Sequence, residues 1–115
     1  MLIVDDHPTF RRFARRLLEE AGFAVVGEAA DCAEALEQTR DLHPQAVLLD
    51  VMLPDGSGLD VAAKLADCFE ATSVVLTSSR SAGDLGAALD EAPARGFIAK
   101  SDFNGAAFAA LVEQE

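Results

Sequence analysis

Short apolar runs recur along the chain at intervals of about 25 residues. Each run is continuous rather than alternating and is rich in branched side chains, which is typical of strands covered on both faces. The sequence therefore predicts five strands, at residues 2–4, 23–26, 46–49, 74–76 and 97–99.

Stretches with helical spacing separate these runs. The first helix is expected over 8–22, with proline at its start and glycine at its end. Asp31 followed by Glu34 has the spacing of a capping box and predicts the start of a second helix. Three more helices are expected at 58–67, 83–91 and 103–113, although Gly83 and Gly86 lower the helix propensity of the fourth.

The order of these elements indicates the fold class. Strand and helix alternate five times along 115 residues, which favours one α/β domain spanning residues 1–115. Connections of this kind produce a doubly wound parallel sheet of five strands with helices on both faces.

Composition then restricts the function. The chain has 20 acidic and 9 basic residues, a net charge of −11, which argues against nucleic-acid binding by this domain. No apolar run reaches the roughly 20 residues that a membrane span requires. Cys32 and Cys68, without a signal peptide, indicate reduced thiols and a cytoplasmic location.

Polar side chains follow the apolar runs at the points where the predicted strands end. Asp5 and Asp6 follow the first run, Asp50 the third, Thr77 the fourth and Lys100 the fifth. Because ligands of open parallel sheets bind beyond the carboxyl ends of the strands, we expect these side chains to share one crevice.

The residue types at this edge indicate phosphoryl chemistry. Three carboxylates close together repel one another unless a cation binds, and oxygen ligands favour Mg²⁺. Mg²⁺ in turn favours a phosphoryl ligand, whose oxygens Lys100 and Thr77 can contact. Asp50 stands alone at a strand end and is the predicted acceptor, whereas the adjacent Asp5 and Asp6 suit metal binding.

Four motifs at these strand ends resemble the receiver domains of bacterial two-component response regulators. They match in order and spacing at Val4–Pro8, Leu48–Gly58, Val75–Ser78 and Gly96–Lys100, and the resemblance covers the whole chain. It implies the flavodoxin-like arrangement of five strands and five helices, with the strand order 2-1-3-4-5.

The resemblance also implies roles for the acidic residues. Asp50 would receive a phosphoryl group from a sensor histidine kinase or from a small acyl phosphate. Asp6 would be a direct Mg²⁺ ligand, Asp5 would support the metal largely through water, and the backbone carbonyl of Met52 would be the third protein ligand.

Other positions carry roles implied by the same resemblance. Lys100 and Thr77 would contact phosphoryl oxygens, and Thr77 would move towards Asp50 on phosphorylation together with the aromatic ring of Phe97. Met52 and Ser79 occupy positions that tune the lifetime of the phosphorylated state.

The basic residues of the first helix have two interpretations. Arg11 and Arg15 can belong to a solvated helix face, where Glu19 and Glu20 provide ion pairs. In the family that the chain resembles, the first helix meets the sensor kinase, so Phe10, Arg11 and Arg15 are candidates for partner docking.

The resemblance implies a phosphorylation-controlled switch that changes partner or dimer contacts, with homodimerisation expected on phosphorylation. Such a domain is not an enzyme beyond accepting its own phosphoryl group and losing it again. The Asp-Asp-His-Pro opening resembles a subgroup that carries DNA-binding helix-turn-helix domains, which favours the receiver part of a transcriptional regulator. A stand-alone receiver, a receiver that acts only by binding, and a Mg²⁺-dependent aspartyl phosphatase are the alternatives.

Overall fold

The computed structural model describes residues 1–69, 72–80 and 82–113. The main sheet contains β1 (Leu2–Val4), β2 (Gly27–Ala29), β3 (Ala46–Asp50), β6 (Ser73–Ser78) and β7 (Gly96–Ala99), and a hairpin contains β4 (Met52–Leu53) and β5 (Gly56–Ser57). The helices are α1 (Pro8–Glu20), α2 (Cys32–Leu42), α3 (Gly58–Cys68), α4 (Ala82–Leu85), α5 (Ala87–Glu91) and α6 (Gly105–Val112), with a 3₁₀ turn at Lys100–Asp102.

The five strands of the main sheet are parallel and lie in the order β2-β1-β3-β6-β7. Counted within this sheet alone, the order is 2-1-3-4-5, so the predicted fold is confirmed. The register places Asp50, the last residue of β3, opposite Thr77 of β6. All five carboxyl ends therefore point to the same edge of the sheet.

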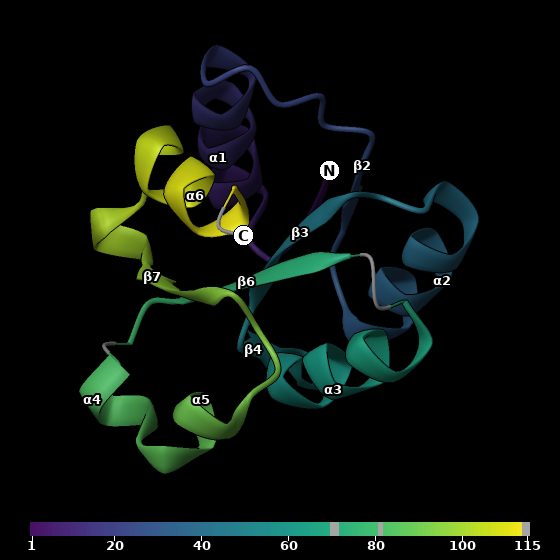
Figure 1. Ribbon diagram of the computed structural model, residues 1–115, viewed down its shortest axis with the longest axis vertical. Helices are drawn as coiled ribbons and strands as arrows, with labels where there is room; N and C mark the ends of the chain where they lie inside the picture. The colour runs from purple at the N-terminus through teal and green to yellow at the C-terminus, as the bar shows by residue number, and fades with distance from the viewer. Residues whose placement is uncertain (70–71, 81, 114–115) are drawn as a thin grey trace.

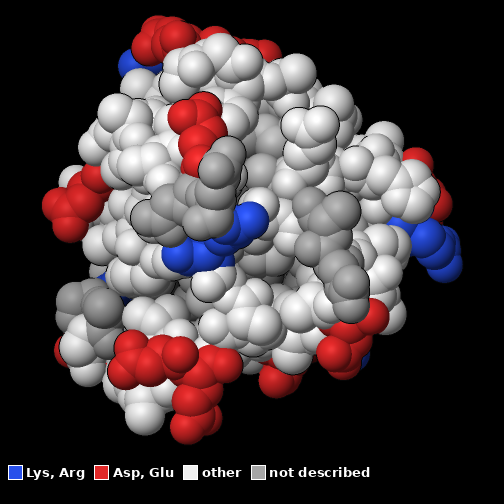
Figure 2. All heavy atoms as spheres, in the orientation of Figure 1, with Lys and Arg blue, Asp and Glu red and all other residues white. Residues whose placement is uncertain are grey.

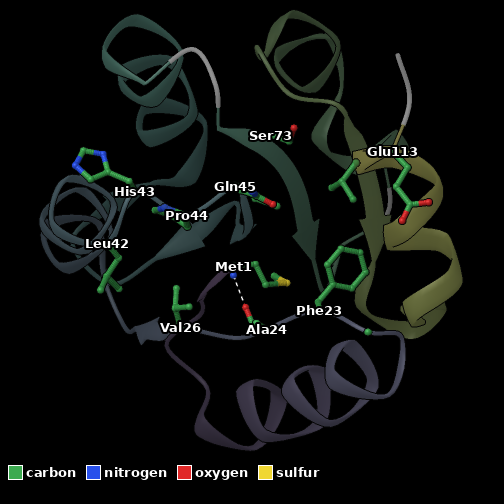
Figure 3. Close-up of a pocket in the computed structure, with 13 residues that line it drawn as sticks. Met1, Phe23, Ala24, Val26, Leu42, His43, Pro44, Gln45, Ser73 and Glu113 are labelled. Carbon is green, nitrogen blue, oxygen red and sulfur yellow. Dashed lines mark hydrogen bonds between the residues drawn. The ribbon is translucent and has the colours of Figure 1, made fainter.

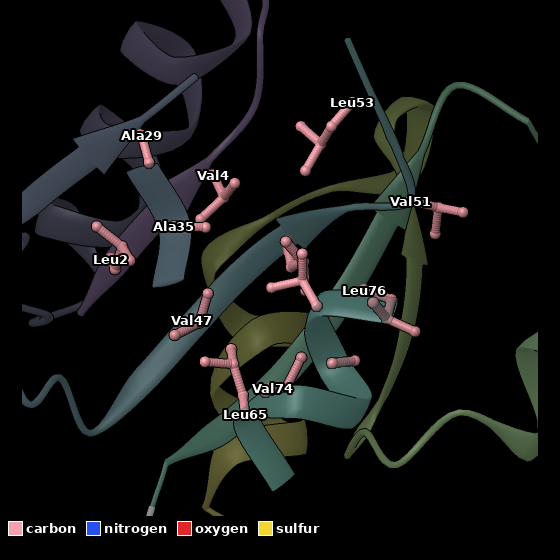
Figure 4. Close-up of a cluster of buried hydrophobic side chains, with 13 residues drawn as sticks. Leu2, Val4, Ala29, Ala35, Val47, Val51, Leu53, Leu65, Val74 and Leu76 are labelled. Atoms are coloured by element: carbon pink, nitrogen blue, oxygen red, sulfur yellow. The ribbon is translucent and has the colours of Figure 1, made fainter. Parts of the chain in front are cut away.

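Helices cover both faces of the sheet, with α1 and α6 on one side and α2 and α3 on the other (Figure 1). Successive residues of the central strands enter opposite cores: Val47 and Leu49 pack on the side of α2 and α3, whereas Leu48 packs on the side of α1 and α6. Figure 4 shows the core on the α2 and α3 side. The central strands β1, β3 and β6 have continuous apolar runs because both of their faces are buried.

Within the part of the chain that the structure describes, no helix has both the length and the apolar character needed to cross a membrane.

The prediction of the second strand at 23–26 is wrong, because the strand that pairs with β1 is Gly27–Ala29. Val26 is 52% exposed, whereas Phe23 packs edge-on against Phe108 of α6. A side chain at Gly27 would lie 2.5 Å from the Gln38 side chain of α2. The strand reads Gly-Glu-Ala, and only Ala29 is buried, so apolar character does not mark this edge strand.

The predicted helix at 83–91 is divided into α4 and α5. Gly86 separates them with φ +67°, a left-handed backbone angle that interrupts helical hydrogen bonding. At the C-terminus, the expected helix over 103–113 begins later, because the Asn104 side chain accepts the backbone N–H of Ala107 and caps α6.

Candidate functional site

The polar residues predicted to share a crevice do meet at the carboxyl edge of the sheet. Asp5 follows β1 and is fully buried, Asp50 ends β3 and is 3% exposed, and Thr77 lies beside it in β6 with no exposed surface. Lys100 follows β7 and opens the 3₁₀ turn. Separate strands therefore bring two acids, a hydroxyl and an amine to one point.

Lys100 links the two buried carboxylates. Its Nζ lies 2.6 Å from Asp5 Oδ2 and 3.1 Å from Asp50 Oδ2, and only 15% of its side chain is exposed. The ring of Phe10 completes the surroundings of the amine, with its centroid 4.6 Å from Nζ. A partly buried cation held between two carboxylates and an aromatic face has little freedom to move.

These contacts shift the pKa values of both partners. Burial raises the pKa of Asp50, and the negative charge of Asp5 raises it further, while the N–H of Met52 and the amine of Lys100 act in the opposite direction. Burial by itself lowers the pKa of Lys100, but its contacts with Asp5 and Asp50 outweigh burial and the net pKa is raised. The ammonium form is therefore favoured, and an additional cation would favour the ionised form of Asp50.

Asp5, Asp6, His7 and Asp50 form a cluster that could hold a metal ion. One ligand atom from each lies within 4.8 Å of the others. Carboxylate oxygens predominate in this set, and such ligands suit hard cations such as Mg²⁺. Asp6 is partly exposed, so the cluster opens to solvent on its side.

His7 was not predicted as a site residue. Its backbone N–H donates to Asp5 Oδ1 at 2.8 Å, and its Nδ1 lies 3.1 Å from the same oxygen and 3.2 Å from Asp6 Oδ1. The side chain is 67% exposed. Its position next to two acids was the only available signal, because sequence alone does not indicate that the ring folds back towards them.

Thr77 provides a second indication that the site fits a phosphoryl group. Its buried Oγ1 has no hydrogen-bond partner among the described residues. A buried hydroxyl without a partner is costly and uncommon in folded proteins. A phosphoryl oxygen at Asp50 would supply the missing acceptor.

The remaining predicted site residues surround this centre. Met52 is 53% exposed and donates its backbone N–H to Asp50 Oδ1 at 3.1 Å. Ser79 is exposed just beyond the end of β6. Phe97 is partly buried in β7 beside a hollow of about 330 Å³ that is also lined by Leu89 and Ala94.

The predicted docking residues on α1 make contacts within the molecule. Arg11 donates from Nε to Glu28 Oε1 at 3.0 Å and from Nη1 to the backbone carbonyl of Asp5. Arg15 Nη1 lies 2.7 Å from Glu28 Oε2. Arg15 Nε also lies 3.6 Å from Glu19 Oε2, which is the ion pair expected within the helix. Arg11 thus ties α1 to β2 and to the strand end that carries Asp5.

A larger hollow, of about 830 Å³, lies at the opposite end of the sheet (Figure 3). Met1, Phe23, Ala24, Pro44 and Ser73 line it, and these residues precede or begin the strands rather than end them. It is therefore separate from the carboxylate cluster.

The acidic character of the chain is visible on the face shown in Figure 2. Acidic side chains gather at several places around its edge, and basic side chains form smaller groups. This distribution agrees with the net charge of −11. It differs from the broad basic surface with which nucleic-acid-binding proteins contact backbone phosphates.

Comparisons with known proteins identify the family. Residues 1–112 match the response regulator receiver domain. A putative transcriptional regulator of Pseudomonas aeruginosa is 37% identical over 102 residues, covering 89% of this chain and 49% of the relative. The nitrate/nitrite response regulator protein NarP of Escherichia coli is 40% identical over 102 residues, covering 87% of this chain and 47% of the relative.

A solved structure agrees with these relatives. The signal receiver domain of the putative response regulator NarL from Mycobacterium tuberculosis is similar with a TM-score of 0.83 and 32% identity, covering 98% of this chain and 95% of that one. The chain belongs to the response regulator receiver domain family, whose members are phosphorylation-controlled switches served by sensor kinases. It spans about half the length of the two transcriptional relatives described.

Proposed function

We propose that the chain accepts a phosphoryl group on Asp50 with the help of Mg²⁺ and acts as a signalling switch. The observation that carries this proposal is the position of the Asp50 carboxylate, which lies 3.1 Å from Lys100 Nζ and within the 4.8 Å cluster of Asp5, Asp6 and His7. A nucleophilic carboxylate, a fixed cation and further acids at one strand edge are the components of phosphoryl transfer to aspartate.

The transfer uses the residues of this chain in distinct roles. An oxygen of Asp50 forms a bond to phosphorus as the bond to the donor breaks, which releases the donor carboxylate or imidazole. Lys100 neutralises a phosphoryl oxygen as charge redistributes, and the free hydroxyl of Thr77 donates to another.

Asp5, Asp6, Asp50 and the backbone carbonyl of Met52 would hold the Mg²⁺ ion. When bound, it neutralises phosphoryl oxygens and offsets the repulsion among the carboxylates. The oxygen-rich cluster fits such an ion, as does the partly exposed side of Asp6, which leaves a path for it to enter.

Phosphorylation then shifts an equilibrium between two arrangements of the domain. Thr77 moves towards the phosphoryl group, and Phe97 turns with it into the hollow at its side. Met52 and Ser79, both exposed near Asp50, influence the access of water and thus the lifetime of the phosphorylated state.

The partners follow from the same proposal. A sensor histidine kinase docks on α1 through Phe10, Arg11 and Arg15. The Arg15 side chain is 41% exposed and the Arg11 side chain 18%, so Arg15 is the more accessible of the two.

Residues 1–115 form one cytoplasmic receiver domain. This domain is not an enzyme, does not itself bind nucleic acid, and homodimerises when phosphorylated. Transcriptional relatives about twice its length support a place in a DNA-binding regulator.

Incubation with acetyl phosphate and Mg²⁺, followed by intact-mass measurement, tests the proposed function. We expect one added phosphoryl group on the wild type and none on Asp50→Asn, because the amide is not a nucleophile. Asp60→Asn, which changes an exposed acid on α3, is the matched control and should be labelled like the wild type. Equal labelling of wild type and Asp50→Asn would contradict the proposal.

A further inference from the structure

The amino-terminal end of α2 is capped twice. The first cap is local: Asp31 accepts the backbone N–H of Glu34 at 2.8 Å, and the Glu34 side chain accepts the N–H of Ala30 at 2.8 Å. The Asp31 half is the capping box that the sequence predicts, whereas Glu34 reaches one residue further back than a capping box requires, to Ala30 instead of Asp31. This local cap leaves the backbone N–H groups of Cys32 and Ala33 without a partner at the helix end.

The second cap comes from Asp55, at the tip of the β4–β5 hairpin. Its Oδ1 accepts the N–H of Cys32 at 2.8 Å, and its Oδ2 accepts the N–H of Ala33 at 3.2 Å. The hydrogen bond from the Cys32 backbone is the main reason that the pKa of Asp55 is lowered. A single carboxylate thus joins two segments that are more than 20 residues apart in the chain.

The same contact involves the Cys32 side chain. Its Sγ lies 4.0 Å from the backbone carbonyl of Ser57. Burial, assisted by Asp55, raises the pKa of this thiol to about 11, so the thiol is neutral at physiological pH. Cys32 packs against the hairpin without adding negative charge there.

The hairpin joined to α2 begins at Met52, two residues after Asp50. Its two strands have two residues each, with Met52 opposite Ser57 and Leu53 opposite Gly56. A ladder this short does not fix its own orientation, so contacts at its ends must do so. Ser57 secures one end by accepting the N–H of Leu59 in α3 at 3.1 Å, and Asp55 secures the other.

We infer that Asp55 is a positioning residue for the metal site, because its two hydrogen bonds to α2 fix the hairpin that presents the Met52 carbonyl. This inference rests on the proposed function. Leu53, 9% exposed in the core beside α2, keeps the hairpin folded when Asp55 is removed. The expected effect is therefore a less well placed carbonyl rather than an unfolded loop.

Calorimetric titration with Mg²⁺, together with melting temperatures, tests the inference. Groups that orient metal ligands typically contribute about tenfold or more to metal affinity. Because Asp55 orients the hairpin that carries Met52, we expect Asp55→Ala to bind Mg²⁺ about tenfold more weakly than the wild type. Asp31→Ala is the matched control, because it removes one acid and one cap from the same helix end. It should lower the melting temperature while leaving Mg²⁺ affinity unchanged.

Asp55→Asn provides a milder variant, because its amide has one acceptor oxygen and retains one of the two hydrogen bonds to α2. Its Mg²⁺ affinity should lie between those of the wild type and Asp55→Ala. Wild-type affinity in Asp55→Ala, or equal weakening in Asp31→Ala, would overturn the inference while leaving the proposed function intact. A wild type that does not bind Mg²⁺ would overturn both.

Discussion

Replacing Gly58 with alanine is expected to destabilise the protein by about 3 kcal/mol and to abolish phosphoryl acceptance, because overpacking against rigid neighbours costs on this scale. A Cβ at Gly58 would collide with the backbone oxygen of Asp50 and would lie 3.0 Å from the Cα of Val51. Both neighbours are backbone atoms, which cannot rotate away. Relief requires movement of the strand end that carries the acceptor.

Thermal unfolding and acetyl phosphate labelling together measure this effect. A loss of about 3 kcal/mol corresponds to a melting temperature lower by roughly 10 °C. Gly22→Ala is the control: Gly22 has φ +98°, and no atom of the described residues lies within 4 Å of the place that its Cβ would take, so this variant tests backbone strain without collision. If Gly58→Ala had the same melting temperature as Gly22→Ala and still accepted a phosphoryl group, the claim that no side chain fits between α3 and the end of β3 would be refuted.

Replacing Lys100 with methionine is expected to lower the free energy of unfolding by about 3 kcal/mol when no divalent cation is present, the scale for breaking a buried ion pair. The change leaves the carboxylates of Asp5 and Asp50, 0% and 3% exposed, without their cation. Mg²⁺ should restore part of the loss, because it neutralises the same carboxylates. It should therefore raise the melting temperature of this variant more than that of the wild type.

Lys64→Met is the matched control for this measurement, because Lys64 is exposed on α3 and its replacement removes the same charge. Its free energy of unfolding should stay close to that of the wild type. Denaturant unfolding in a chelator and then in Mg²⁺ compares the three proteins. Equal stability of Lys100→Met and Lys64→Met in the chelator would show that Lys100 does not hold the carboxylates together.

The sequence was sufficient to predict the parts of the fold that hydrophobic periodicity controls. Strands β1, β3 and β6 are buried on both faces, and their continuous apolar runs predict them closely. The apolar run also predicts β7, although β7 is an edge strand in which only Ile98 is buried. The edge strand β2 could not be predicted in this way, because its sequence, Gly-Glu-Ala, contains no apolar run. Gly86 was recognised as unfavourable in a helix, but its left-handed conformation depends on tertiary context.

The candidate site could be predicted because parallel strands bring their ends together. Asp5, Asp50, Thr77 and Lys100 meet as expected from their place after apolar runs. Contacts that depend on side-chain direction could not be predicted in this way. The fold of the His7 ring towards Asp6 depends on its side-chain conformation, and the capping of α2 by Asp55 joins residues that are 23 positions apart in the chain.

The central claim is that Asp50 is the phosphoacceptor, and locating the phosphoryl group tests it most directly. The wild type is treated with acetyl phosphate and Mg²⁺ and then with borohydride, which reduces an aspartyl phosphate to homoserine, and its peptides are sequenced by tandem mass spectrometry. We expect homoserine at position 50 alone, and none when Mg²⁺ is removed by a chelator. Homoserine at Asp5 or Asp6 with Asp50 unchanged would contradict the account.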